Sequence, residues 1–207
     1  MEAKQRIFRN QKKDDILICN VQCLPESAIC PSTLLKAGVN EPDTELCVAE
    51  EPDGTWIHFR DKAYRIPVDE IRLLGQHNYF DIGVVYGVCS ILGMDDGAFT
   101  AGLKTYEPLP HRLQYLGERD GVKYYDDSIS TICDTTIQAL KTLKDTDTVL
   151  IGGMDRGIDY RELIEYLSEC QVRHIILMEA TGKRIYQEIY KFYPEFKDRP
   201  RLILAEH

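Results

Sequence analysis

Short apolar runs separated by turn residues dominate the first half of the chain and predict β-strands. The runs are residues 15–20, 45–50, 55–60 and 62–67. Pro52-Asp53-Gly54 separates the second run from the third, and Arg60-Asp61-Lys62 separates the third from the fourth. Because these residue types favour tight turns, the last two runs are expected to form a hairpin.

Two helices are predicted to follow these strands. Residues 78–92 place apolar side chains at the spacing of one helix face. These side chains are Ile82, Val85, Cys89 and Leu92. Gly93 is expected to end this helix as a C-cap. Asp95-Asp96 then begins a second helix that runs to about Thr105, with its acidic residues where the helix dipole favours them.

The second half changes to an alternation of strands and helices after Pro108 and Pro110, where we place a domain boundary. Two runs, residues 113–118 and 122–127, flank a turn at residues 119–121 and predict a hairpin. The later elements are expected as a helix at 135–143, a strand at 148–153, a helix at 160–170, a strand at 174–179, a helix at 182–192 and a strand at 201–206. This order predicts an α/β domain of Rossmann type with a parallel sheet.

The composition narrows the classes of function. Of the 207 residues, 43% are hydrophobic and 29% are charged, which is typical of a globular protein with a substantial core. The formal net charge of −9 argues against a nucleic-acid partner, because a phosphate backbone is bound by a basic face. No apolar run approaches the ~18 residues of a membrane span. The N-terminus also lacks the apolar core of a signal peptide.

The seven cysteines favour reduced thiols in a cytoplasm, because their number is odd and no secretory signal precedes them. Cys19, Cys23 and Cys30 lie close together in the sequence. No C-x-x-C pair is present, however, and no histidine stands at zinc-finger spacing. A metal site is therefore the less favoured interpretation of these cysteines.

Two loops after predicted strands carry residues suited to ligand binding, because α/β domains bind ligands at the carboxyl ends of their strands. Residues 125–131 combine carboxylates and hydroxyls that could hold a magnesium-bound nucleotide phosphate and orient an amino acid. Composition alone favours a plainer interpretation, in which Ser130, Thr131 or Asp134 caps the next helix. The glycines of residues 152–159 permit either close backbone approach or an ordinary αL connection with a solvated Asp/Arg pair.

Two short polar pairs also have a plain and a functional interpretation. His77 and Asn78 lie where a helix is expected to begin at Tyr79, and asparagine is a common N-cap. His111 and Arg112 directly follow Pro110. They are either a solvated basic pair in a linker or, through the arginine, a bridge to a phosphate.

Taken together, these segments resemble the ATP-dependent Mur ligases, and within them the members that add glutamate to UDP-N-acetylmuramoyl-L-alanine. The matching segments, in family order, are Gln76-His77-Asn78, Leu109-Pro110-His111-Arg112, residues 126–131 and residues 152–160. The string at residues 2–8 is similar to the family's A-K-x-R-I-[FY]. The resemblance covers nearly the whole chain.

This resemblance implies a fold and an activity. Residues 1–106 would be the C-terminal part of the central ATPase domain, and residues 107–207 a truncated C-terminal Rossmann-like domain. The full enzyme would phosphorylate the carboxylate of UDP-N-acetylmuramoyl-L-alanine with ATP and Mg2+. The amine of glutamate would then attack the acyl phosphate. The reaction belongs to the cytoplasmic synthesis of peptidoglycan precursors, and thereby to cell wall formation, cell shape and cell division.

Roles for individual residues follow from the same resemblance. The nucleotide-binding residues would be His77, Asn78, Arg112 and Asp127. Arg112 and Asp127 would also act in catalysis, and Ser128 and Thr131 would position the amino acid. Lys4, in carbamylated form, would help to hold magnesium. The G-x-x-x-x-G-K-[ST] loop, the metal-binding glutamate and the UDP-sugar domain do not occur in the sequence, so the chain is expected to be an inactive fragment.

Three departures from the family pattern bear on specificity. Ile129 stands where glutamate-adding members often have a lysine, Ile132 where asparagine is usual, and Asp81 where a second asparagine is found. They leave open whether D- or L-glutamate is used. Two alternatives to this ligase also stay open. One is a non-catalytic module that binds a nucleotide or an amino acid, and the other is an enzyme of folylpolyglutamate synthetase type.

Overall fold

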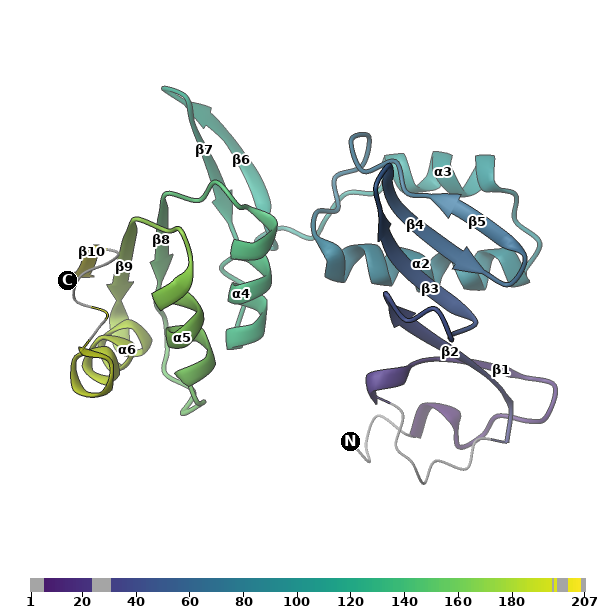
Figure 1. Cartoon of the computed structure of the whole chain (residues 1–207), viewed down its shortest axis with the longest axis horizontal. Coiled ribbons are helices and arrows are strands. Elements are labelled where there is room, and N and C mark those ends of the chain that lie inside the picture. The colour runs from purple at the N-terminus through teal and green to yellow at the C-terminus, as the bar shows by residue number, and fades with distance from the viewer. Residues whose placement is uncertain (1–5, 24–30, 195, 197–200, 206–207) are drawn as a thin grey trace. The chain divides into compact units, whose positions relative to one another are not determined.

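The structure is a computed structural model that describes residues 6–23, 31–194, 196 and 201–205 (Figure 1). The chain divides into two compact units, Met1–Pro108 and Leu109–His207. Each unit has its own hydrophobic core. We describe the two units separately.

A five-stranded sheet forms the centre of the first unit, with its strands in sequence order. The strands are β1 (Ile16–Asn20), β2 (Thr33–Val39), β3 (Leu46–Glu51), β4 (Gly54–Phe59) and β5 (Lys62–Arg65). The first three pair in parallel, whereas β3, β4 and β5 are antiparallel. Short 3-10 helices lie at Arg6–Phe8 and Val21–Cys23. The predicted strands are confirmed, but β2 was not expected from the sequence.

Helices α2 (Gln76–Ile91) and α3 (Asp96–Thr105) complete the first unit. Gly83 of α2 packs so closely on the sheet that a Cβ there would lie 2.5 Å from Val48 Cγ2. The predicted end of this helix is confirmed, because Gly93 has a φ of 82° and donates its N–H to the Ser90 carbonyl at 3.1 Å. Asp95 caps α3 by accepting the Ala98 N–H at 2.9 Å.

The second unit begins with a hairpin and continues as an α/β layer. The hairpin strands are β6 (Gln114–Arg119) and β7 (Val122–Asp126), and left-handed Asp120 and Gly121 form the turn between them. A parallel sheet has the order β10-β9-β8. Its strands and helices are α4 (Cys133–Thr142), β8 (Thr148–Ile151), α5 (Arg161–Glu169), β9 (His174–Met178), α6 (Glu179–Phe192) and β10 (Arg201–Ala205).

The core of the second unit lies between this sheet and its helices. Ile164 and Leu167 of α5, Ile175 and Leu177 of β9, and Ile185 of α6 are all fully buried. Crossover helices between parallel strands bury apolar side chains against the sheet in this way. The predicted α/β class with a mainly parallel sheet is confirmed.

Candidate functional site

The candidate site joins two segments of the second unit: residues 109–113 and residues 126–132, which comprise the last residue of β7 and the loop after it. The His111 ring Nδ1 lies 2.7 Å from Asp126 Oδ2. The His111 carbonyl accepts the Ile129 N–H at 3.2 Å. The Leu113 N–H donates to Asp127 Oδ1 at 2.9 Å. These three contacts fasten the residues on both sides of Arg112 to the loop after β7.

Hydrogen bonds within the loop itself explain its shape. Asp126 Oδ1 accepts the Ser128 N–H at 2.9 Å, which is an Asx-turn. Asp127 Oδ2 accepts the Ser130 hydroxyl at 2.5 Å, and the Asp127 carbonyl accepts the Ser130 N–H at 3.0 Å. The two aspartates thus organise the backbone, while Ser128 and Thr131 stay exposed to solvent.

The backbone of Arg112 is held in place by its neighbours, whereas its side chain has no partner among the described residues. Its guanidinium is exposed and makes no hydrogen bond or ion pair with any residue that the structure describes. On either side, His111 and Leu113 have positive φ values of 64° and 45°. A left-handed conformation of a non-glycine residue costs of order 1–3 kcal/mol and persists only where its surroundings enforce it. The hydrogen bonds to the loop after β7 supply that constraint.

The electrostatics of the loop follow from the His111 contact. The hydrogen bond from His111, with a second from the Ser128 N–H, lowers the pKa of Asp126 from its usual 3.8 to about 2. The Asp126 carboxylate therefore stays ionised at neutral pH. An ionised carboxylate accepts hydrogen bonds from both partners, and these bonds keep the two segments together.

The plain interpretation of the loop as a helix cap is wrong. Helix α4 begins at Cys133 with Ile132 as its N-cap, and no side chain makes a capping hydrogen bond. Ser130 donates to Asp127 instead. The Thr135 hydroxyl, inside the first turn, donates to the Ile132 carbonyl at 2.7 Å. The polar side chains of residues 126–131 are thus not used to begin α4.

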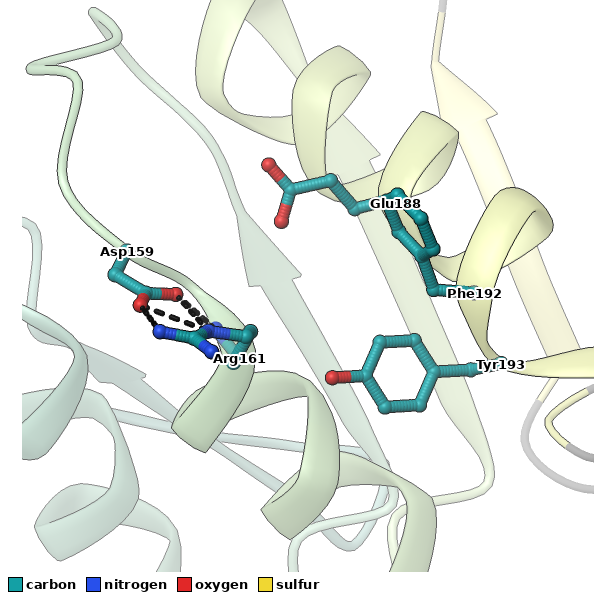
Figure 2. A pocket seen from close by; sticks show the side chains of 5 residues that line it. All are labelled: Asp159, Arg161, Glu188, Phe192 and Tyr193. Carbon is teal, nitrogen blue, oxygen red and sulfur yellow. Dashed lines mark hydrogen bonds and ion pairs between the residues drawn. The ribbon is translucent and has the colours of Figure 1, made fainter.

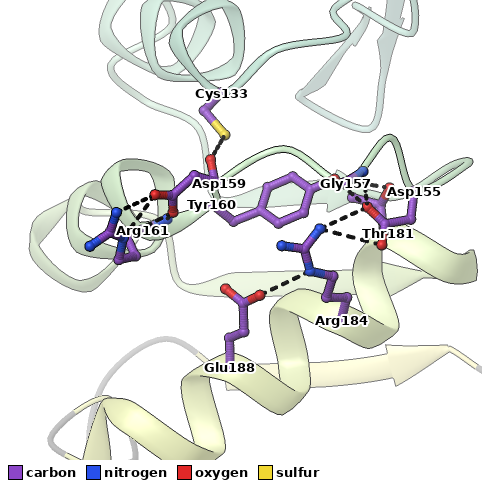
Figure 3. Close-up of polar contacts among 9 residues, drawn as sticks. All are labelled: Cys133, Asp155, Gly157, Asp159, Tyr160, Arg161, Thr181, Arg184 and Glu188. Atoms are coloured by element: carbon purple, nitrogen blue, oxygen red, sulfur yellow. Dashed lines mark hydrogen bonds and ion pairs between the residues drawn. The ribbon is translucent and has the colours of Figure 1, made fainter.

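The second glycine-containing loop, residues 152–160, is organised by Asp155 (Figure 3). Its carboxylate accepts the Gly157 N–H at 2.9 Å and the Tyr160 hydroxyl at 3.2 Å. Arg184 of α6 donates to the same oxygen at 3.0 Å and lies over the Tyr160 ring at 4.9 Å. The Gly157 N–H and the guanidinium are among the causes that lower the pKa of Asp155.

Close backbone approach explains one glycine of this loop. A Cβ at Gly152 would lie 2.6 Å from the Met178 carbonyl oxygen, so no larger residue fits there without a shift. The loop is therefore more than the solvated Asp/Arg connection that the sequence left open. Its arginine partner is Arg184, about thirty positions downstream, and no sequence pattern had indicated that residue.

A pocket of about 500 Å³ lies beside the start of α5 (Figure 2). It is lined by Asp159, Arg161, Glu188, Phe192 and Tyr193. Asp159 and Arg161 form an ion pair, which with the Arg161 N–H lowers the pKa of Asp159 to about 2. Glu188 accepts a hydrogen bond from Arg184 at 3.0 Å. Both carboxylates of the pocket are therefore already paired with arginines of the same unit.

His77 and Asn78, which are expected to bind the nucleotide, lie in the first unit. Helix α2 begins at Gln76 with Gly75 as its N-cap, so the expectation that Asn78 caps a helix starting at Tyr79 is wrong. Asn78 lies in the first turn and donates its side-chain amide to the Leu74 carbonyl at 2.7 Å. His77 precedes it in the same turn. Lys4 lies outside the residues that the structure describes.

No group of three or more histidine, cysteine, aspartate or glutamate side chains that could hold a metal ion occurs among the described residues. Cys30 lies outside them, and the described cysteines are free thiols: Cys19, Cys23, Cys47, Cys89, Cys133 and Cys170. The described helices include none that is long and apolar enough to cross a membrane.

Solved structures define the class of fold. No protein-family model matches the sequence. The MurF ligase of Thermotoga maritima in complex with ADP superposes with a TM-score of 0.68 and 16% identity, over 99% of this chain and 47% of that one. A Mycobacterium tuberculosis folylpolyglutamate synthase complexed with ADP gives a TM-score of 0.58 at 16% identity, over 84% and 40%. The fold is that of the Mur and folylpolyglutamate ligases.

Sequence relatives then select the Mur branch. A UDP-N-acetylmuramoyl-L-alanine--L-glutamate ligase of Xanthomonas campestris is 35% identical over 152 residues, 70% of this chain and 32% of its own length. A UDP-N-acetylmuramoylalanine--D-glutamate ligase of Thermoanaerobacter is 28% identical over 206 residues, 94% of this chain and 43% of its own. The chain belongs to the Mur ligase family, and the expected resemblance to its glutamate-adding members is confirmed. It spans 32% to 43% of the length of these relatives.

Proposed function

We propose that this chain is part of an ATP-dependent ligase that joins glutamate to UDP-N-acetylmuramoyl-L-alanine through an acyl phosphate. Residues 1–106 would be the end of its central ATPase domain, and residues 107–207 its C-terminal domain. The observation that carries the proposal is Arg112, an exposed guanidinium without a partner among the described residues, held by its neighbours beside the Asp127 loop. A free arginine fixed in this way is suited to bind a phosphate.

In this scheme the residues of the second unit bind and orient. Arg112 stabilises negative charge on the transferring phosphoryl group, because its planar donors can hold two oxygens at once. Asp127 keeps the loop in place and steers the nucleotide. The exposed hydroxyls of Ser128 and Thr131 are available to position the amino acid. Holding two reactants in this way accelerates a reaction chiefly by orientation.

His77 and Asn78 stay the proposed nucleotide-binding residues of the first unit. Magnesium, when bound, would neutralise phosphate charge. The described residues offer no ligand cluster for it, so we derive no step through the metal. Lys4, in carbamylated form, stays the proposed magnesium residue. Because the substrates are ATP and a UDP-linked precursor, we place the reaction in the cytoplasm.

The stereochemistry of the glutamate is a separate question. The relatives include ligases named for L-glutamate and for D-glutamate. Ile129 and Ile132 are 45% and 54% exposed, so two apolar side chains border the proposed amino-acid site. The experiment that tests the function must therefore offer both enantiomers.

The experiment is a segment exchange. The matching region of the Thermoanaerobacter relative, which aligns over 206 residues, is replaced by this chain. The hybrid is then assayed for ATP-dependent ligation of D- and L-glutamate to UDP-N-acetylmuramoyl-L-alanine. We expect ligation of one enantiomer, abolished or strongly reduced by Arg112→Ala. Arg119→Ala, an exposed arginine at the hairpin tip, is the matched control. A folded hybrid that ligates neither enantiomer would refute the assignment.

Two further measurements separate the alternatives. The isolated chain should release no phosphate from ATP when both substrates are present, because the sequence has no G-x-x-x-x-G-K-[ST] loop. A hybrid that extends a folate substrate with glutamate, but leaves the UDP-linked substrate unchanged, would favour the folylpolyglutamate synthetase type. Binding of a nucleotide or an amino acid without turnover in any hybrid would favour the non-catalytic module.

A further inference from the structure

We propose that His111 and Asp126 are positioning residues, a clasp that fixes Arg112 for its phosphate. Neither residue is given a direct role in the proposed reaction. The inference rests on the proposed function for the identity of the ligand, but the clasp itself is a property of this chain. It is defined by the 2.7 Å contact between His111 Nδ1 and Asp126 Oδ2.

The clasp matters because Arg112 has no other side-chain anchor among the described residues. Its own N–H donates to the Leu109 carbonyl at 3.3 Å, which is within the preceding turn. Its position relative to the loop after β7 therefore depends on the residues beside it. His111 contributes a ring and a carbonyl contact, and Leu113 contributes an N–H contact to Asp127.

The clasp should have a measurable effect on the backbone conformation beside Arg112. His111 and Leu113 both adopt positive φ values, which an unconstrained chain leaves for a more relaxed conformation. The His111 N–H donates to Gln114 Oε1 at 2.9 Å, and the ring contact is the side-chain interaction that joins His111 to the loop after β7. Without it, the Leu113 N–H should separate from Asp127 more often, and Arg112 should lose its fixed position.

The chemistry of the pair determines which ring nitrogen of His111 carries the hydrogen. An ionised carboxylate only accepts hydrogen bonds, so Nδ1 of His111 must carry the hydrogen whether the ring is neutral or protonated. Asp126 is the charged side chain in contact with the ring. Asp127, in the same loop, turns its carboxylate to Leu113 and Ser130. The clasp should therefore persist as the ring gains a proton.

A second histidine–aspartate pair in the same unit allows a matched control. His174 Nδ1 lies 3.1 Å from Asp147 Oδ2, so the same two side-chain types make the same contact. That pair lies at the starts of β8 and β9 and takes no part in the proposed site. His174→Ala therefore removes an equivalent ion pair without touching Arg112.

The test uses the full 207-residue chain, its His111→Ala variant and the His174→Ala control. Amide hydrogen exchange of Arg112 and Leu113 is followed by NMR. We expect exchange of the Leu113 amide to accelerate about tenfold in His111→Ala and less than about twofold in His174→Ala. Core amides of β9 should be unchanged in both variants. Equal Leu113 exchange in all three proteins would overturn the proposal.

Asp126→Asn distinguishes the clasp from simple loss of stability. The amide can still accept the Ser128 N–H through its oxygen and donate to His111 through its nitrogen. We expect Leu113 to stay protected near neutral pH and the hydrogen of the His111 ring to move from Nδ1 to Nε2. Asp126→Ala, whose side chain can neither accept from the ring nor donate to it, should lose the Leu113 protection that Asp126→Asn keeps. Equal Leu113 protection in Asp126→Ala and Asp126→Asn would count against the clasp.

A separate titration tests the ligand. MgADP is added to the wild-type chain while the NMR chemical shifts of the Arg112 and Leu113 amides are followed. If the MgADP-induced shift changes are severalfold smaller in His111→Ala, the positioning role extends to phosphate binding. Absence of any shift in the wild type at millimolar MgADP would refute phosphate binding at Arg112. The exchange data would still decide the clasp, so the two failures are distinguishable.

Discussion

Replacement of Arg112 by alanine should separate catalysis from stability. The side chain is exposed and makes no hydrogen bond or ion pair with the described residues, so its loss should change the free energy of unfolding by less than about 0.5 kcal/mol. Hydrogen bonds to a charged group contribute about 1.5–3 kcal/mol. If Arg112 makes such bonds to the transferring phosphoryl group, its loss should lower turnover by about 10- to 150-fold.

Steady-state kinetics of the segment-exchange enzyme measure this effect. Turnover should fall in Arg112→Ala while the KM for glutamate stays nearly constant, because the arginine acts on the phosphate and not on the amino acid. Arg112→Lys should recover part of the loss, since lysine supplies a charge without the planar pair of donors. The control Arg119→Ala should match the unmodified hybrid. A turnover within about threefold of wild type for Arg112→Ala, with the fold intact, would refute the catalytic role.

Four further predictions concern stability, each measured by urea unfolding. Gly83→Ala should destabilise the first unit by about 1–2 kcal/mol, because its Cβ would lie 2.5 Å from Val48 Cγ2. Gly102→Ala, with nothing within 4 Å, should stabilise that unit by about 0.5–1 kcal/mol, and Trp56 fluorescence reports both. The hydrogen bonds that lower the pKa of Asp126 stabilise the fold while its carboxylate is ionised. The free energy of unfolding should therefore fall as the pH drops from 3.8, the usual pKa, to about 2, and it should fall less in His111→Ala. Arg184→Ala should destabilise the second unit through lost contact with Tyr160 and Asp155, and an unchanged NMR-detected midpoint would contradict this.

Local sequence patterns predicted the structure correctly wherever short-range interactions determine it. Gly93 ends α2 because a left-handed C-terminal residue needs no Cβ, and Asp120-Gly121 forms the hairpin turn for a related reason. Apolar periodicity also located the helices and most of the strands. Strand β2 was missed because Lys36 and Gly38 interrupt its apolar pattern. It becomes a strand through parallel pairing with β1 and β3, which is a non-local interaction.

The sequence alone determined which residues the candidate site would contain. Arg112 and Asp127 stand in recognisable motifs, and such motifs depend on residue type and order. Tertiary structure decided how these residues are used. The contact of His111 with Asp126 and the role of Asp127 as acceptor for Leu113 depend on a backbone that brings two segments together. The pairing of Asp155 with Arg184 likewise joins a loop to a helix far along the chain. Contacts of this kind arise from packing in space, which residue spacing does not encode.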